Sequence, residues 1–350
     1  MKLLITTQAV DQNDPALAFF LQWVSEFAKH CEQVTVVCLR EGKYTLPDNV
    51  RVVCIDPSRR SSRISRAIRF ISFMFRERAS YDTVFVHMNP EYLVLGGWYW
   101  RLRGIRSGLW YTHRSVDLKL RIATLFANIV FTASPEGFRL KNDKVCAMGH
   151  GIDTDRFHRE ISDLKLHKPL NLLCVGRITP IKDQKTAVEA LALLKKEGVD
   201  VHLTFIGVPS AVGDDAYAHE VKELIAQKGL EGQVTFAGAV TYDDMPKQYE
   251  NMDFSLNLCP TGGLDKVVFE SMAAGVPTLV ANTAFANLFG PYKDLLVFRH
   301  GNARDLAMKI EAIARLSEES LRDIRIELGR TVWGKADVSA LVTSIVQYLI

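Results

Sequence analysis

The sequence predicts an α/β protein of two doubly wound domains that face each other across a cleft. The chain has 350 residues, about twice the length of a typical domain. Short apolar runs alternate with longer amphipathic runs along it, which is typical of parallel strands joined by helices on both faces of a sheet. A polar stretch without strong periodicity, residues 153–169, separates two such series, and we place one domain on each side of it.

In the first half, short runs rich in β-branched and aromatic residues are expected to be strands. In chain order they are KLLITT, VTVVCL, RVVCI, TVFVH, SGLWYT, NIVFTA and KVCAMG. The first helix is expected over residues 15–30, because Asn13 and Asp14 are good caps and Pro15 at the first helical position loses no hydrogen bond.

The second half repeats the pattern. Its predicted strands are LNLLCVG, VHLTFIG, QVTFAG, DFSLNL and PTLVA. The helices KTAVEALALLKKEG, DAYAHEVKELIAQKG and VVFESMAAG each end at glycine, as a left-handed C-terminal cap requires. We therefore expect domains at 1–155 and 156–332, with a last helix in 333–350 that packs back towards the first domain.

Composition describes an ordinary globular protein, with 48% hydrophobic and 24% charged residues and a net charge of +3. The six cysteines show no CxxC pairing and lie mostly in apolar runs, so we expect free thiols in a reducing compartment. The first apolar run is too short for a signal peptide, and no later one offers about 18 uncharged residues. We expect a cytoplasmic protein whose membrane contact, if it has one, is peripheral.

The turn after the first strand of the second half, VGRITPIKDQKT, carries charges suited to an anion. Gly176 permits a tight turn, Arg177 offers a planar fork of donors, and Lys182 places a point charge near the next helix. Cations that meet a helix N-terminus suit a diphosphate, although a solvated surface loop would have the same composition. Three further strand ends, at 205–209, 236–240 and 257–266, also carry glycine.

Taken together, these residues resemble the nucleotide-sugar-binding half of the GT-B glycosyltransferases, in particular glycosyltransferase family 4. The resemblance rests on VGR followed by Lys182, on HGID at 150–153 followed by Phe157, and on FESMAAGVPTLVA. It covers residues 145–350 strongly. The first half matches through its order of strands and helices and through WYTH at 110–113.

The resemblance implies two Rossmann-like domains, the first for an acceptor and the second for a nucleotide sugar. Arg177 and Lys182 would bind the donor diphosphate and stabilise its departure, and Glu270 would accept hydrogen bonds from the ribose. His113 would lie close to the transferred sugar. The remaining implied donor contacts are Gly176, backbone groups from Gly238 to Val240 around the base, and the turn residues Gly263, Leu264, Asp265 and Lys266.

One position departs from the family pattern. The family has a glutamate eight residues before the one at Glu270, in contact with the donor sugar, and this chain has Gly262 there. We hypothesise that Asp265 supplies a carboxylate from a shifted backbone, or that loop amides bind the sugar hydroxyls instead. A protein that has lost catalysis is the remaining alternative.

The reaction implied by the resemblance is transfer of a sugar to a hydroxyl acceptor with retention of configuration. It would need no metal and no cofactor besides the donor, because two cations oppose the departing phosphate. A histidine after a strand, such as His113, is as often a core residue as a site residue. His87, which ends another predicted strand of the first half, and Asn89, two residues later, are candidates for the acceptor site.

Residues 59–78 carry seven arginines and one glutamate, while Ile64, Ile68, Ile71 and Phe75 recur at helical spacing. Such a helix suits an anionic membrane surface at the inner face of the plasma membrane. The alternative is that the apolar stripe packs on the sheet and the arginines face water. Residues 1–160 hold 23 Lys and Arg against 16 Asp and Glu, and the remainder hold 20 against 24.

Other classes fit less well. No nucleic-acid recognition motif accompanies the arginines, so we expect no nucleic-acid partner. A nicotinamide enzyme would need GxGxxG after the first strand, where ITTQAVDQND stands. A nucleotide-sugar epimerase of the same fold and a non-catalytic sugar-nucleotide-binding protein stay open, as do the donor base, the donor sugar and the acceptor.

Overall fold

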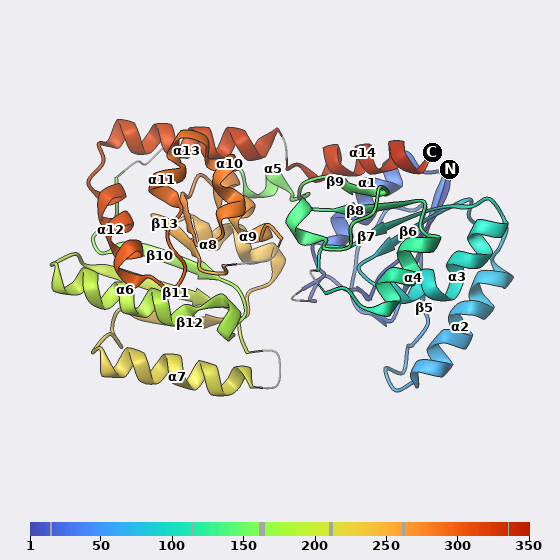
Figure 1. Cartoon of the computed structure of the whole chain (residues 1–350), viewed down its shortest axis with the longest axis horizontal. Helices are drawn as coiled ribbons and strands as arrows, with labels where there is room; N and C mark the ends of the chain where they lie inside the picture. The colour runs from blue at the N-terminus through green and yellow to red at the C-terminus, as the bar shows by residue number, and fades with distance from the viewer. Residues whose placement is uncertain (15, 114, 161–164, 210–212, 261–262, 335) are drawn as a thin grey trace. The chain divides into compact units, whose positions relative to one another are not determined.

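The computed structural model describes residues 1–350 except 15, 114, 161–164, 210–212, 261–262 and 335 (Figure 1). The chain forms two compact units, one of Met1–Asp153 with Ala336–Ile350 and the other of Thr154–Lys335. Each unit holds one large parallel sheet and its helices. The predicted fold class, two Rossmann-like α/β domains, is confirmed at this level. The boundaries expected from the sequence were 155 and 332.

Unit 1, the first of these, contains a sheet of seven parallel strands in the order β5-β3-β1-β6-β7-β8-β9. All seven strands expected in this half are present. Their bounds are β1 (Lys2–Thr6), β3 (Gln33–Cys38), β5 (Val50–Cys54), β6 (Thr83–His87), β7 (Arg106–Trp110), β8 (Ile129–Thr132) and β9 (Val145–Ala147). A separate parallel pair is formed by β2 (Ala9–Val10) and β4 (Arg40–Glu41).

Helices cover both faces of this sheet. Their bounds are α1 (Phe20–His30), α2 (Arg63–Arg76), α3 (Glu91–Leu102), α4 (Leu118–Phe126) and α14 (Val338–Leu349). Side chains alternate along each strand, so that Leu3 and Ile5 of β1 face the cluster with α1 and α14, whereas Leu4 faces the cluster with α2, α3 and α4.

The chain returns to unit 1 at its C-terminal end. Ile152 and Asp337 pair as a short parallel bridge, and Trp23 Nε1 of α1 donates to the carbonyl of Gly151 at 3.3 Å. Helix α14 then lies beside α1 (Figure 1). Its apolar residues, Leu341 and Ile345 among them, complete one face of the core.

Helix α2 does not pack on the sheet through the apolar stripe that the sequence analysis considered. The residues buried against the sheet and α3 are Phe70, Phe73 and Met74. Ile64 and Ile68 are 73% and 61% exposed, and Phe75 is 39% exposed. The packing alternative is therefore wrong for these three side chains. No helix in the described part of the chain is long and apolar enough to cross a bilayer.

Unit 2, residues Thr154–Lys335, contains five parallel strands in the order β12-β11-β10-β13-β14. All five expected strands are present. Their bounds are β10 (Leu170–Val175), β11 (Val201–Ile206), β12 (Val234–Gly238), β13 (Phe254–Asn257) and β14 (Thr278–Val280). The order reverses between β10 and β13, and open α/β sheets bind ligands beside the C-terminal strand ends at such a point.

The helices of unit 2 follow the strands. Their bounds are α5 (Thr154–Phe157), α6 (Gln184–Lys196), α7 (Asp214–Gln227), α8 (Met245–Tyr249), α9 (Lys266–Ala273), α10 (Ala286–Phe289), α11 (Lys293–Leu296), α12 (Ala303–Ala314) and α13 (Glu318–Trp333). The expected left-handed glycines after α6, α7 and α9 are confirmed at Gly198, Gly229 and Gly275.

The start of α1 differs from the expectation. The helix begins at Phe20, and residues 16–19 form turns held by Asp14, while residue 15 lies outside the described residues. Asp14 Oδ1 accepts hydrogen bonds from the backbone N–H groups of Ala16 and Leu17, both at 3.0 Å. Its Oδ2 accepts one from Arg40 at 2.8 Å. The aspartate thus caps a turn rather than the helix itself.

We expect Asp14→Ala to lower the free energy of unfolding by about 1–2 kcal/mol, because it leaves two partly buried N–H groups and a guanidinium without their acceptor. Urea denaturation measures this change. Asp48→Ala, which alters an exposed aspartate of the same unit, serves as the control. Equal stabilities of the two variants would contradict this role for Asp14.

Candidate functional site

The strand ends of unit 2 meet backbone to backbone. Gly176 N–H, directly after β10, donates to the carbonyl of Ile206 at 2.9 Å, and Gly207 N–H, directly after β11, donates to the carbonyl of Gly238 at 2.7 Å. A Cβ on Gly207 would lie 2.1 Å from the Gly176 carbonyl oxygen, so no other residue fits there without movement. The glycines predicted at these strand ends therefore allow the turns to lie close together.

Lys182 lies over this glycine turn. It ends the short 3₁₀ helix Pro180–Lys182, which leads into α6. A Cβ built on Gly176 would meet the side-chain carbons of Lys182 at 3.6 Å, so the lysine stem crosses the turn. Its Nζ lies 2.5 Å from Oδ2 of Asp265, and the two side chains are only 19% and 30% exposed.

Asp265 links two strand ends of the sheet. The residue precedes α9 but makes no side-chain cap there. Its Oδ2 accepts from Lys182, after β10, and from Asn257 Nδ2, at the end of β13, at 2.8 Å. The three residues form what we call the strand-end triad, which lies where the strand order reverses.

Asn257 belongs to this site, although the sequence did not identify it. It is 3% exposed, and its Oδ1 is buried with no hydrogen-bond partner within the described ranges. The available signal was a side-chain amide near the end of the predicted strand DFSLNL.

Arg177 reaches solvent from the same turn as Lys182. Its carbonyl accepts a hydrogen bond from Gln184 Nε2 at 2.9 Å, and Gln184 is buried in the first turn of α6. This bond fixes the backbone from which the guanidinium projects. The structure thus presents the exposed Arg177 and the mostly covered Lys182 on one turn after β10.

Glu270 and Lys266 lie one turn apart on α9. Glu270 is 3% exposed, and its Oε1 is 3.9 Å from Lys266 Nζ. Burial raises the pKa of the Glu270 carboxyl, and nearby Lys266 opposes this shift. Burial likewise lowers the pKa of the Lys266 ammonium, which lies 5.6 Å from the centre of the Tyr242 ring. A buried carboxylate of this kind favours a ligand that donates hydrogen bonds.

The other predicted donor contacts lie around these groups. Gly238 ends β12 with φ +75°, and Val240 follows it half-buried. Gly263 and Leu264, both half-buried, lead into Asp265. Gly262 lies outside the described residues. Their roles towards a donor stay predictions.

The candidates in unit 1 have different surroundings. His113, three residues after β7, is exposed and packs edge-on against Tyr111. His87 is 2% exposed, stacks on Phe20 with ring centres 3.8 Å apart, and shares a 3.1 Å hydrogen bond with Thr7. A core position was the alternative for His113. The structure shows such a position for His87 instead. Asn89 lines a pocket beside α2 and α3. The acceptor roles of His87 and Asn89 stay predictions.

Comparisons with known proteins agree with this arrangement. The family model of the glycosyl transferases group 1 matches residues 156–330. A GDP-mannose-dependent alpha-(1-6)-phosphatidylinositol monomannoside mannosyltransferase of Mycobacterium tuberculosis is 31% identical over 150 residues, 39% of this chain and 37% of that protein. The putative colanic acid biosynthesis glycosyltransferase WcaL of Salmonella typhimurium is 24% identical over 60% of this chain and 51% of its own length. The matched part thus spans between about a third and a half of these relatives.

The fold is also that of known structures. Anabaena Alr3699/HepE, solved in complex with UDP and glucose, superposes with a TM-score of 0.78 at 19% identity, over 100% of this chain and 99% of the other. The predicted GT-B fold is confirmed by this likeness. With half of its length matched by the family model, the chain belongs to the glycosyl transferases group 1.

Proposed function

We propose that this chain is a glycosyltransferase that moves a sugar from a nucleoside-diphosphate sugar to a hydroxyl of a glycan or lipid-linked glycan. The strand-end triad carries the proposal, because it places Lys182 over a glycine turn at the strand-order reversal, within a family of glycosyltransferases. The names of the mannosyltransferase and of WcaL support a role in building cell-envelope glycans.

The chemistry asked of the protein is chiefly electrostatic. A nucleotide sugar carries its leaving group, so the enzyme has to orient the acceptor and stabilise charge on the departing phosphate. Arg177 and Lys182 supply that charge from one turn. Glu270 accepts hydrogen bonds from the ribose, and the backbone from Gly238 to Val240 holds the base. We propose that transfer proceeds with retention and without a metal ion or cofactor, and that His113 lies near the transferred sugar.

Asp265 has two roles in this proposal. Without a ligand it neutralises Lys182, which is mostly covered and would otherwise be an unpaired charge. When a diphosphate takes over Lys182, the carboxylate of Asp265 becomes available to the hydroxyls of the donor sugar. It would then replace the carboxylate that the family has at the position of Gly262.

A second part of the proposal concerns the membrane. Ile64, Ile68 and Phe75 are exposed on α2, and the ring of Phe75 lies 6.4 Å from that of the exposed Trp98 on α3. Seven arginines lie in the same segment, residues 59–78. Exposed apolar side chains among arginines suit the anionic face of a bilayer. We propose peripheral binding at the inner face of the plasma membrane.

Lys182→Ala is expected to weaken binding of UDP or GDP by tenfold to a hundredfold, about 1.5–3 kcal/mol, because a charge-assisted contact is lost. Calorimetric titration without added metal, repeated with Mg²⁺, measures this loss and the metal requirement together. Lys195→Ala, at the far end of α6, is the control and should bind as the unaltered protein does. Unchanged affinity in Lys182→Ala would remove the main support for a donor site here.

Asp265→Asn should change the affinity for the nucleoside diphosphate and the turnover in opposite directions. Affinity for the nucleoside diphosphate alone should rise several-fold, because Lys182 loses its competing partner, whereas turnover with the nucleotide sugar should fall about tenfold or more. Titration and steady-state kinetics measure the two effects. If both quantities stay unchanged, Asp265 does not serve the donor.

The double variant Ile64→Ser, Ile68→Ser should lose most of its binding to vesicles that contain phosphatidylglycerol, because it removes exposed apolar contact area. Co-sedimentation measures this binding. Met308→Ser alters an equally exposed apolar residue of unit 2 and should leave binding unchanged. Equal binding by the double variant would show that α2 does not dock on the bilayer.

A further inference from the structure

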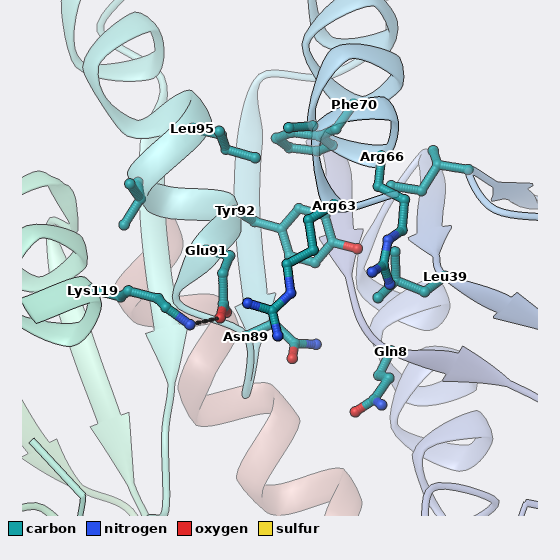
Figure 2. A pocket seen from close by; sticks show the side chains of 13 residues that line it. Gln8, Leu39, Arg63, Arg66, Phe70, Asn89, Glu91, Tyr92, Leu95 and Lys119 are labelled. Carbon is teal, nitrogen blue, oxygen red and sulfur yellow. Dashed lines mark hydrogen bonds and ion pairs between the residues drawn. The ribbon is translucent and has the colours of Figure 1, made fainter. Parts of the chain in front are cut away.

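A pocket of about 430 Å³ opens in unit 1 between helices α2 and α3 (Figure 2). It lies beside the residues that follow strands β1, β3, β5 and β6, and its size is that of sites for small molecules. The apolar part of its lining consists of Leu39, Ile55, Ala67, Phe70, Val94 and Leu95. The donor site of unit 2 uses none of these residues.

Two buried donors face this pocket without a partner. The Nδ2 of Asn89 and the hydroxyl of Tyr92 are buried, and neither makes a hydrogen bond with any residue that the structure describes. Tyr92 is 5% exposed, and burial raises the pKa of its hydroxyl, which therefore keeps its proton and can donate. Buried polar groups left unpaired are costly, so a ligand rich in acceptor oxygens fits here.

Two arginines add positive charge to the same space. Arg63 and Arg66 extend from the first turns of α2 toward Asn89 and Tyr92 (Figure 2). Arg63 makes no ion pair within the described ranges. Arg66 makes a long ion pair, with 3.9 Å between its Nε and Oδ2 of Asp56. The remaining charged residues of the lining, Lys119 and Glu91, neutralise each other at 2.7 Å.

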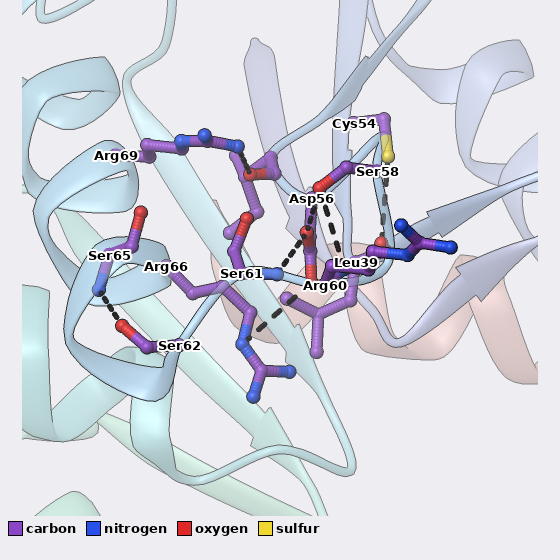
Figure 3. A network of polar contacts seen from close by, with 11 residues as sticks. Leu39, Cys54, Asp56, Ser58, Arg60, Ser61, Ser62, Ser65, Arg66 and Arg69 are labelled. Carbon is purple, nitrogen blue, oxygen red and sulfur yellow. Dashed lines mark hydrogen bonds and ion pairs between the residues drawn. The ribbon is translucent and has the colours of Figure 1, made fainter.

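The first turn of α2, from which these arginines extend, is held in position by the segment before it (Figure 3). Asp56 Oδ1 accepts hydrogen bonds from the backbone of Ser61 and from the hydroxyl of Ser58. Ser62 caps the helix by accepting from the N–H of Ser65, and Arg69 donates to the carbonyl of Ile55. The start of α2 is thus tied to the end of β5, and the site is organised before a ligand arrives.

We propose that this pocket binds a phosphate monoester, with Arg63 and Arg66 on the phosphoryl oxygens, Asn89 and Tyr92 donating to them, and the apolar wall beside the carbon skeleton. A phosphate monoester carries nearly two charges and three acceptor oxygens, whereas a carboxylate carries one charge and two. Two guanidiniums and two neutral donors match the former. The inference rests on the proposed function, whose acceptor it identifies as a phosphorylated compound.

The test is calorimetric titration with glycerol 3-phosphate, with glycerol as the neutral comparison. The unaltered protein should bind the phosphate ester and not glycerol. The double variant Arg63→Gln, Arg66→Gln should bind it at least about tenfold more weakly, because two charge-assisted contacts are lost. Arg76→Gln, at the other end of α2 and well exposed, is the matched control and should bind normally.

Tyr92→Phe provides a variant that keeps the packing. It should weaken glycerol 3-phosphate binding about threefold to tenfold without lowering the melting temperature, because the hydroxyl has no hydrogen-bond partner to lose among the residues that the structure describes. A lower melting temperature with unchanged affinity would mean that Tyr92 only packs the core, and would overturn its role in the pocket.

Vesicles of phosphatidylcholine with phosphatidic acid distinguish the source of the phosphate. Binding of free glycerol 3-phosphate that depends on Arg63 and Arg66 assigns a soluble phosphate ester. Binding only to these vesicles, with a larger loss in the Arg63→Gln, Arg66→Gln variant than in Arg76→Gln, assigns a lipid headgroup. Either result supports the pocket. Equal losses in the double variant and in Arg76→Gln, or no binding of either probe, would overturn it.

Nucleotide binding separates this inference from the proposed function. The Arg63→Gln, Arg66→Gln protein should bind UDP or GDP as the unaltered protein does, because its changes lie in unit 1. If nucleotides bind and neither glycerol 3-phosphate nor the phosphatidic acid vesicles do, the pocket assignment alone falls. If glycerol 3-phosphate binds and no nucleotide does, the transferase proposal falls, and with it the acceptor role of the pocket.

Discussion

The site in unit 2 depends on one ion pair, that between Lys182 and Asp265. The lysine is mostly covered, so its charge has to be balanced by a neighbour or by a ligand. Asp265 provides that balance while Asn257 orients the same oxygen. Because Lys182 comes after β10 and Asn257 ends β13, the pair also joins the two strands at which the sheet order reverses. A diphosphate that enters has to compete for this lysine, which couples ligand binding to the release of a carboxylate.

Helix α2 has a comparable importance in unit 1. Its residues contact the sheet, the solvent and the pocket beside α3. Phe70, Phe73 and Met74 hold it on the sheet, and the exposed isoleucines face away from that contact. Its first turns direct Arg63 and Arg66 into the neighbouring pocket. A phosphorylated acceptor at this pocket and a bilayer at the isoleucines would lie on one helix, which gives a physical reason for the basic charge of the first half of the chain.

The strands and the glycine-capped helices could be predicted from the sequence, because apolar runs of strand length and C-terminal glycines are local signals. The strand-end triad could not. Lys182 and Asp265 are 83 residues apart, and they meet only because β13 lies beside β10. The orientation of α2 could not be predicted from the sequence either, because two of its faces carry apolar residues at helical spacing. One face holds Ile64, Ile68 and Phe75, and the other holds the buried residues Phe70, Phe73 and Met74. His87 ends a strand and His113 comes soon after one, and only the packing around Phe20 distinguishes the buried ring from the exposed one.

The most direct test of the central claim is a crystal structure of the protein with a bound nucleoside diphosphate. We predict that Lys182 contacts a phosphate oxygen, that Glu270 accepts from the ribose, and that Asp265 has moved out of contact with Lys182 while Asn257 stays at the end of β13. A nucleotide bound elsewhere, with Lys182 still paired to Asp265, would contradict the account.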